Sequence, residues 1–230
     1  MLRRRPSLIL FDLDGTLVDS APDLAAAIDR MLGVLGHPPA GEEKVRGWIG
    51  HGLPQLVRRA LTHELWPEKD PPDFERALAL YQGFYREAMV VGSRVYPGVF
   101  DGLQALSAQH WPMACVTNKH SAFTRALLEA VNLLDFFKVT LSGDEVPRPK
   151  PDPMPLLKLA EQFKVRPDEL LMVGDSEADA RAARAAGSQL VLVRYGYHGS
   201  GGVERLKPDL LLDSLAELPA ALPMATPPTH

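Results

Sequence analysis

The sequence has few of the features that mark a secreted or membrane protein. It contains one cysteine, Cys115, so no disulfide can form within the chain, and its apolar neighbours in Met113–Val116 predict a buried strand thiol. The apolar stretch after Arg3–Arg5 ends at Phe11, which is too short for a signal peptide, and no run reaches the length that spans a bilayer. We therefore expect a cytoplasmic protein with no membrane partner.

An excess of positive charge is also missing. The 25 Lys and Arg residues are outnumbered by 29 Asp and Glu residues, which gives a formal net charge of -4 at pH 7. The one basic cluster, Arg3–Arg5, is interpreted as a solvated flank. No nucleic-acid partner is expected. With 46% hydrophobic residues in 230, the composition is that of a globular protein with a sizeable core, either a monomer or a homodimer.

The motifs of several common enzyme classes are absent as well. There is no Gly-x-Ser-x-Gly elbow, no Walker loop and no Rossmann glycine fingerprint. The 7 histidines have no metal-ligand spacing, although His51 and His198 lie in Gly-rich loops that could reach a substrate. Serine-nucleophile hydrolases, P-loop enzymes and classical dinucleotide-binding enzymes are therefore disfavoured.

What the sequence does contain is a regular alternation of strands and helices. Residues 8–11 form a short apolar run that is typical of a fully buried strand. Helical periodicity and short apolar runs then alternate along the second half of the chain, which predicts an α/β fold with a doubly wound parallel sheet. The further strands are predicted at 113–117, 139–142, 170–173, 189–193 and 210–212, and the helices at 99–108, 121–131, 155–163 and 177–186.

A block of helices separates the first predicted strand from the others. Helical stripes of apolar residues run through 24–35, 53–61 and 74–89, a shorter helix is predicted at 42–48, and Ser20 is the expected N-cap of the first helix. We therefore expect an all-helical cap at 19–92, without strands, inserted into a core made of 1–18 and 93–218. Hinges are expected near 18–20 and 92–98. The tail at 219–230, with four prolines, is predicted to be disordered.

Polar residues gather where the predicted strands end. Ligands of open α/β sheets bind beyond the carboxyl ends of the strands, so these residues are expected to share one site. Each has a plainer interpretation by itself, such as a polar turn, a helix cap or a surface lysine, but the combination favours a site. The residues concerned are Asp12 and Asp14 after the first strand, Thr117 and Asn118 after the second, Lys150 in a Pro-rich turn, and Asp175 and Asp179 after the fourth.

This set of side chains suits phosphoryl transfer. Asp12 and Asp14 lie on the same side of an extended chain, and two acids in a small space favour a hard cation such as Mg²⁺. A carboxylate can attack a phosphate once positive charge, here Mg²⁺ and Lys150, neutralises the phosphate oxygens. Asp14 can then protonate the leaving oxygen and later deprotonate water, while Thr117 and backbone N–H groups hold the phosphate.

The same residues carry a resemblance to a known family. Their order and spacing are similar to those of the haloacid dehalogenase superfamily over nearly the whole chain. That resemblance implies a Rossmann-like core, dependence on Mg²⁺, Asp12 as nucleophile and Asp14 as general acid and base. Dehalogenases lack the second acid, so Asp14 favours a phosphatase. The matching motifs are Asp12-Leu13-Asp14-Gly15-Thr16, Thr117-Asn118, Lys150 and Gly174-Asp175-Ser176-x-x-Asp179.

The resemblance also implies individual roles. Metal ligands would be Asp12, the backbone carbonyl of Asp14, and Asp175, with Asp179 supporting both the metal site and Lys150. Phosphate or substrate contacts would come from Thr16, Thr117, Asn118 and Lys150, with Arg46 and His51 as candidates from the cap.

Within the superfamily, the chain looks like the bacterial phosphoglycolate phosphatases. The similar segments are Asp19–Leu24, Val45–Gly52, Val57–Leu61 and Tyr195–Tyr197, whereas His51 stands where that family commonly has Asn. The resemblance implies a phosphomonoesterase that converts 2-phosphoglycolate to glycolate and phosphate. The alternatives are a phosphatase for another small phosphosugar or for pyrophosphate, a phosphomutase, and a non-catalytic binding module on the same fold.

Overall fold

The computed structural model describes residues 2, 4–198 and 201–223 of the chain. Its core is a six-stranded sheet with the order β5-β4-β1-β6-β7-β8, and all five pairings are parallel. The structure thus confirms the α/β fold class and each strand that the sequence predicts, within one residue at either end. The strands are β1 (Leu8–Phe11), β4 (Met113–Val116), β5 (Val139–Leu141), β6 (Leu170–Gly174), β7 (Gln189–Val193) and β8 (Leu210–Leu212).

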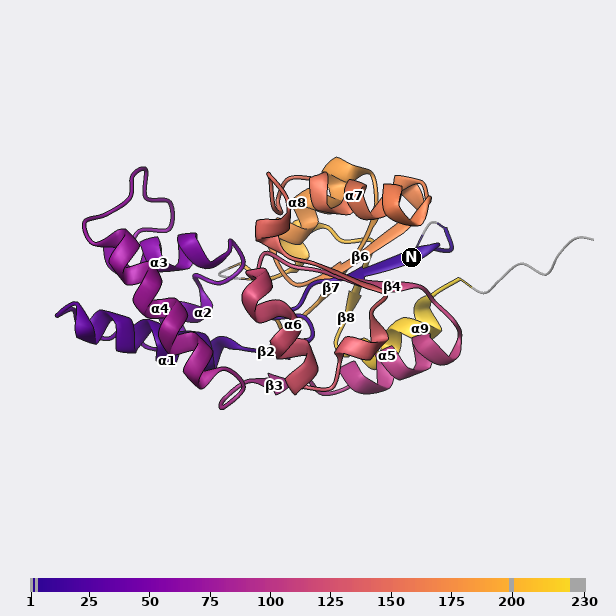
Figure 1. Ribbon diagram of the computed structural model, residues 1–230. Coiled ribbons are helices and arrows are strands. Elements are labelled where there is room, and N and C mark those ends of the chain that lie inside the picture. The colour runs from indigo at the N-terminus through magenta and orange to yellow at the C-terminus, as the bar shows by residue number, and fades with distance from the viewer. Residues whose placement is uncertain (1, 3, 199–200, 224–230) are drawn as a thin grey trace, which may run out of the picture.

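Helices cover both faces of this sheet (Figure 1). One face packs against α5 (Val99–Ala108), α6 (Ser121–Ala130) and α9 (Leu218–Ala221). The other face packs against α7 (Met154–Phe163) and α8 (Glu177–Ala186). None of the helices in the described residues is long and apolar enough to cross a membrane.

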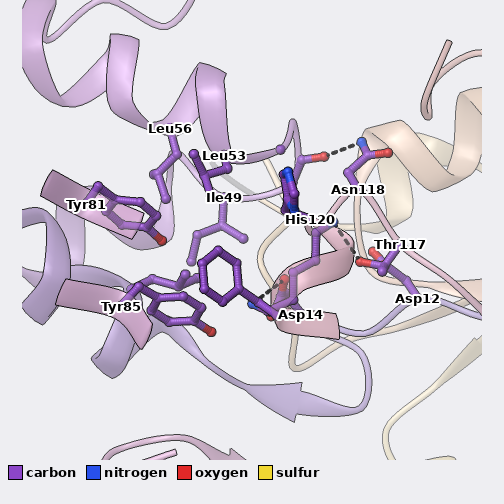
Figure 2. Close-up of a pocket in the computed structure, with 15 residues that line it drawn as sticks. Asp12, Asp14, Ile49, Leu53, Leu56, Tyr81, Tyr85, Thr117, Asn118 and His120 are labelled. Atoms are coloured by element: carbon purple, nitrogen blue, oxygen red, sulfur yellow. Dashed lines mark hydrogen bonds and ion pairs between the residues drawn. The ribbon is translucent and has the colours of Figure 1, made fainter. Parts of the chain in front are cut away.

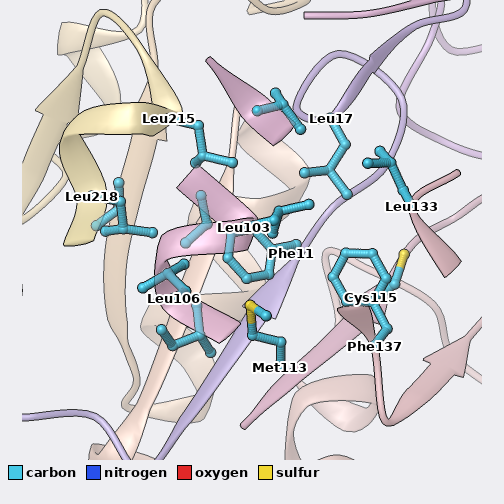
Figure 3. Close-up of a cluster of buried hydrophobic side chains, with 14 of the residues drawn as sticks. Phe11, Leu17, Leu103, Leu106, Met113, Cys115, Leu133, Phe137, Leu215 and Leu218 are labelled. Atoms are coloured by element: carbon cyan, nitrogen blue, oxygen red, sulfur yellow. The ribbon is translucent and has the colours of Figure 1, made fainter. Parts of the chain in front are cut away.

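The central strand β1 shows why its sequence is apolar throughout. It lies between β4 and β6, and all four of its residues are buried because helices cover both of its faces. Successive side chains alternate between the faces: Ile9 and Phe11 join one apolar cluster, whereas Leu8 and Leu10 join the other. Figure 3 shows the first cluster, in which Cys115 lies beside Phe137 and burial raises the pKa of its thiol, as expected for an inert strand residue.

A second group of helices follows β1 directly. These helices pack on one another around an apolar cluster of their own, and Figure 1 shows them together at one end of the molecule, away from the sheet. This arrangement supports our proposal that 19–92 form a cap, inserted into a core of 1–18 and 93–218. The helices are α1 (Ala21–Val34), α2 (Glu42–Arg46), α3 (Leu53–Thr62) and α4 (Phe74–Ala88).

The crossings between the two groups contain two strands that the sequence did not predict. β2 (Val18–Asp19) pairs antiparallel with β3 (Arg94–Val95), with Asp19 opposite Arg94. The expectation that 19–92 contain no strand is therefore wrong at its first residue. Two-residue strands show no periodicity in a sequence, and this pairing exists only because both crossings run side by side.

The predicted disorder of 219–230 is also wrong in part. Pro219 lies in the first turn of α9, where its missing N–H costs nothing, and Leu218 and Leu222 are buried against the core. The number of prolines pointed to a disordered tail, but these two leucines, one helical turn apart, anchor the segment. The remainder of the predicted tail, 224–230, lies outside the described residues.

Two helical glycines provide a test of how tightly the core is packed. A Cβ added at Gly102 in α5 would lie 2.5 Å from the carbonyl oxygen of Leu215, whereas one at Gly83 in α4 would meet nothing within 4 Å. We expect Gly102→Ala to lower the free energy of unfolding by about 1–3 kcal/mol through overpacking. Gly83→Ala, the matched control, should raise it by about 0.5–1 kcal/mol. Urea denaturation measures both changes, and effects of the same sign would contradict the packing described here.

Candidate active site

The first two acids follow β1 in a sharp turn. Gly15 has a φ of 86°, which favours glycine, and a Cβ there would collide with the carboxylate of Asp175 and the ring of Tyr197. The N–H groups of Leu17 and Val18 both donate to the carbonyl of Leu13, which closes the turn. The chain is thereby folded back at the end of β1, so that Asp12 and Asp14 remain at the carboxyl edge of the sheet.

Three buried carboxylates lie together at this edge. Asp12 follows β1, Asp175 follows β6 and Asp179 lies in the first turn of α8, and one ligand oxygen from each falls within 4.8 Å of the others. Burial, and next the charge of Asp179, raise the pKa of Asp12 to about 7. Burial likewise raises the pKa of Asp175. Oxygen donors that repel one another at such close range fit a hard divalent cation.

Lys150 supplies a buried positive charge to the same cluster. Its Nζ lies 3.0 Å from Asp12 Oδ1 and 2.6 Å from Asp179 Oδ1, and it donates to the carbonyl of Val116 at 2.8 Å. Burial acts to lower the pKa of this lysine, but the two carboxylates outweigh that effect and raise it. Lys150 is therefore a fixed charge that orients Asp12.

The residues after β4 join this edge to the cap. Thr117 lines the cavity described below, and Asn118 Nδ2 donates to the carbonyl of Gly50 at 2.9 Å and to that of Lys150 at 2.7 Å. Thr16, a predicted phosphate contact, is instead fully buried and donates its hydroxyl to Asp175 Oδ1 at 2.8 Å. Thr16 thus orients an acid of the cluster and does not line the cavity.

Asp14 is held by two donors, neither of which was predicted to be a site residue. Lys119 Nζ lies 3.0 Å from its Oδ1 and 3.2 Å from its Oδ2, and Ser20 Oγ donates to Oδ1 at 2.6 Å. Ser20 was predicted to cap α1, but its side chain makes no capping bond. Pro22 has no N–H to offer at one of the positions that a capping side chain usually binds, so the hydroxyl binds Asp14 instead.

A cavity of about 50 Å³ opens between this edge and the cap. Figure 2 shows Asp12, Asp14 and Thr117 on one side of it and Tyr81, Tyr85 and Leu56 on the other. The cavity therefore has an ionic wall from the core and a largely apolar wall from the cap. Its lining consists of Asp12, Asp14, Thr117, Asn118, Lys119, His120 and Phe123 from the core and Leu24, Ile49, Gly50, Gly52, Leu53, Leu56, Tyr81 and Tyr85 from the cap.

The cap candidate Arg46 lies at the crossing between cap and core. Its Nη2 is 2.8 Å from Asp19 Oδ2, and Tyr197 donates its hydroxyl to Asp19 Oδ1 at 2.6 Å. Burial acts to raise the pKa of Asp19, but these two donors outweigh that effect and hold the pKa below its usual range. The backbone N–H of Tyr197 donates to Asp175 Oδ2 at 2.5 Å. A chain of contacts therefore runs from Arg46 of the cap through Asp19 and Tyr197 to Asp175 of the acidic cluster. Arg46 itself does not line the cavity.

The two loop histidines also lie outside the central cavity. His51 packs edge-on against Trp66, with ring centroids 4.8 Å apart, and burial, then the charge of Arg59, lower its pKa to about 4. It borders two larger open cavities, of ≈790 and ≈600 Å³, on the flanks of the junction between cap and core. His198 Nε2 lies 3.0 Å from the carbonyl of Arg194 and borders the smaller of these.

Comparison with known proteins agrees with this arrangement. The family model described as haloacid dehalogenase-like hydrolase matches residues 9–193, which include all four motifs. The chain belongs to the haloacid dehalogenase-like hydrolase family. Within this family, it is 48% identical over 209 residues to the phosphoglycolate phosphatase of Nitrosospira multiformis, covering 91% of this chain and 92% of that protein. It is 47% identical over 209 residues to that of Thiobacillus denitrificans, with coverage of 91% and 92%.

Solved structures of haloacid dehalogenase-like hydrolases share the fold as well. A predicted phosphoglycolate phosphatase from Haemophilus somnus superposes with a TM-score of 0.88 at 35% identity, over 95% of this chain and 99% of that one. The similarity therefore extends through both the sheet and the inserted helices.

The raised pKa of Asp12 predicts how stability depends on pH when no metal is bound. Between its unfolded value of 3.8 and its folded value of about 7, Asp12 binds more protons in the folded state. Its contribution to the free energy of unfolding must therefore fall as the pH rises through that window. Each pKa unit corresponds to about 1.4 kcal/mol, so the effect is measurable.

We expect Asp12→Asn to be more stable than the wild type in EDTA at pH 8, and the difference to shrink by pH 5. Thermal or urea denaturation across that range measures it. Asp101→Asn, which changes an exposed acid on α5, is the matched control and should show no such trend. A constant difference between wild type and Asp12→Asn would show that Asp12 does not titrate in this range.

Proposed function

We propose that this protein is a Mg²⁺-dependent phosphomonoesterase that hydrolyses 2-phosphoglycolate to glycolate and phosphate. The observation that carries the proposal is the position of Asp12. It is buried, bound to Lys150, adjacent to Asp175 and Asp179, and shares a small cavity with a second acid, Asp14. The names of the relatives support the substrate.

Asp12 is the proposed nucleophile. The N–H of Leu13 donates to Asp12 Oδ1 at 2.7 Å, and Lys150 lies 3.0 Å from the same atom, so the carboxylate is held in one orientation. One of its oxygens forms a bond to phosphorus while the bond between phosphorus and the ester oxygen breaks, which leaves an aspartyl phosphate. Asp14 gives its proton to the departing glycolate oxygen and then takes one from the water that attacks phosphorus. The bond between phosphorus and Asp12 breaks, which releases phosphate and restores the Asp12 carboxylate.

The acidic cluster fits a divalent cation, for which we propose Mg²⁺. When bound, the cation neutralises the oxygens of the transferring phosphate. Asp12, Asp175 and the backbone carbonyl of Asp14 would hold it. Asp179 suits a supporting role, because its Oδ1 binds Lys150 and its Oδ2 accepts from the hydroxyl of Ser176 at 2.6 Å. Thr117, Asn118 and Lys150 are the proposed contacts of the phosphate oxygens.

The cavity argues for a small ester and against a phosphomutase. A mutase needs cap groups that hold a second phosphoryl group, and Arg46 and His51 are the cap residues predicted to contact the substrate. Arg46 is bound to Asp19, and His51 packs on Trp66 outside the cavity. The apolar cap wall excludes water during the reaction. The proposed partner is thus the small phosphate ester, and the proposed location remains the cytoplasm.

The proposed mechanism predicts different losses for the two acids. Asp12→Asn should abolish release of phosphate from 2-phosphoglycolate, because an amide cannot serve as the nucleophile. Asp14→Asn should lower kcat by about 10²–10⁴-fold, the usual contribution of a general acid and base. EDTA should remove activity and added Mg²⁺ restore it. Phosphate release measures all three effects, with Asp101→Asn as an unaffected control. Wild-type turnover in Asp12→Asn would rule out the covalent mechanism.

The substrate is tested by a panel of phosphate esters. We expect kcat/KM to be highest for 2-phosphoglycolate, lower for small phosphosugars and lowest for pyrophosphate, since the cavity is small and its cap wall is largely apolar. A phosphosugar well ahead of 2-phosphoglycolate would contradict the proposed substrate and leave the phosphatase chemistry in place.

A further inference from the structure

Two donor groups in the central cavity have no part in the phosphate chemistry. Lys119 follows Asn118 in the core, and its side chain is only 4% exposed. Tyr85 lies on α4 of the cap and is completely buried. Both line the cavity together with Asp14, and Lys119 Nζ lies 4.8 Å from the centroid of the Tyr85 ring. Core and cap thus each contribute one donor to the same part of the cavity.

The hydroxyl of Tyr85 lacks an acceptor. It is buried and makes no hydrogen bond within the described part of the chain. A buried hydroxyl without a partner is destabilising, so an acceptor from outside the chain is expected at this point. Burial, and then the charges of Asp14 and Asp23, raise the pKa of Tyr85, which keeps it a donor. In Figure 2 its oxygen lies at the end of the ring that faces Asp14.

Lys119 is the one Lys or Arg side chain among the residues that line this cavity. Its present partner is Asp14, but Asp14 also accepts from Ser20 Oγ at 2.6 Å. Asp14 therefore keeps a donor when Lys119 turns to a ligand. An ammonium and a phenol that converge on one small space suit a second anionic group, a carboxylate, better than a neutral hydroxyl.

The spacing agrees with the chemistry of the proposed substrate. In 2-phosphoglycolate a single CH₂ separates the ester oxygen from the carboxylate. Since Asp14 must reach the ester oxygen, the group that binds the carboxylate has to lie directly beside Asp14. Lys119 meets this requirement, with its Nζ 3.0 Å from Asp14 Oδ1.

We propose that Lys119 and Tyr85 form a carboxylate subsite, which selects phosphate esters that carry a carboxylate one carbon from the ester oxygen. The proposal rests on the phosphatase function proposed above. On binding, the substrate carboxylate replaces Asp14 as the partner of Lys119 and accepts from the hydroxyl of Tyr85. The surrounding side chains of Leu24, Ile49 and Leu53 leave the hydroxyls of a sugar phosphate without partners, which disfavours such substrates.

The test compares two esters, 2-phosphoglycolate and 2-hydroxyethyl phosphate, which differ only in having a carboxylate or a neutral CH₂OH. Tyr85→Phe should lower kcat/KM for 2-phosphoglycolate by about 10–100-fold, the range expected for one hydrogen bond to a charged group. Lys119→Met should lower it by about 100-fold or more. Tyr85→Phe should alter kcat/KM for 2-hydroxyethyl phosphate by less than about 3-fold. Lys119→Met also removes a donor from Asp14, so it should lower kcat/KM for both esters, and by a larger factor for 2-phosphoglycolate. Removal of an unpartnered hydroxyl leaves the fold intact, so Tyr85→Phe is informative even if Lys119→Met fails to fold.

Two matched variants serve as controls. Tyr96→Phe removes a buried hydroxyl that lies outside the cavity, and Lys158→Met removes an exposed lysine on α7. Neither should change the ratio of kcat/KM between the two esters. Equal losses on both esters in Tyr85→Phe, or no loss on either, would overturn the subsite while leaving the phosphatase in place. A wild-type protein that releases phosphate from neither ester would overturn both proposals.

Discussion

The contact on which the rest of the site depends is the bridge from Lys150 to Asp12 and Asp179. Parallel strands bring their carboxyl ends to one edge, and here that edge carries three buried acids that repel one another. An ammonium between two of them, 3.0 and 2.6 Å away, offsets part of that repulsion and fixes the orientation of Asp12. One charge thus stabilises the folded edge and also prepares the carboxylate that we propose as the nucleophile.

The inserted helices serve a different purpose from the sheet. The core carries the ionic groups, whereas the cap contributes an apolar wall and the hydroxyl of Tyr85. Among the contacts that join the two parts, Asn118 of the core donates to the carbonyl of Gly50, and Tyr197 of the core donates to Asp19, which also binds Arg46 of the cap. In the proposed function the core supplies the reacting acids and Lys119, and the cap supplies Tyr85 and the apolar wall, so a change in the cap is expected to alter the choice of substrate without touching the acids.

Much of this architecture could be predicted from the sequence. Buried parallel strands are apolar along their whole length and amphipathic helices repeat every 3.6 residues, so both signals are local. The prediction missed β2 and β3, which have two residues each, and misjudged the segment from Pro219 to Leu222. In each case the deciding interaction joins segments that are far apart in the chain, and a local pattern carries no sign of it.

The candidate site likewise combines features that the sequence predicts with features that depend on contacts between distant segments. By itself the sequence determined the chemical groups, Asp12, Asp14, Lys150 and Asp175, because residue type and position at the strand ends establish which chemistry is available. Only the tertiary structure decided the partners of these groups. In the structure Thr16 binds Asp175, and both Ser20 and Lys119 bind Asp14. Tyr85 of the cap lies over Lys119. Hydrogen bonds and ion pairs depend on distances of about 3 Å, and only the packing of cap on core brings the partners so close.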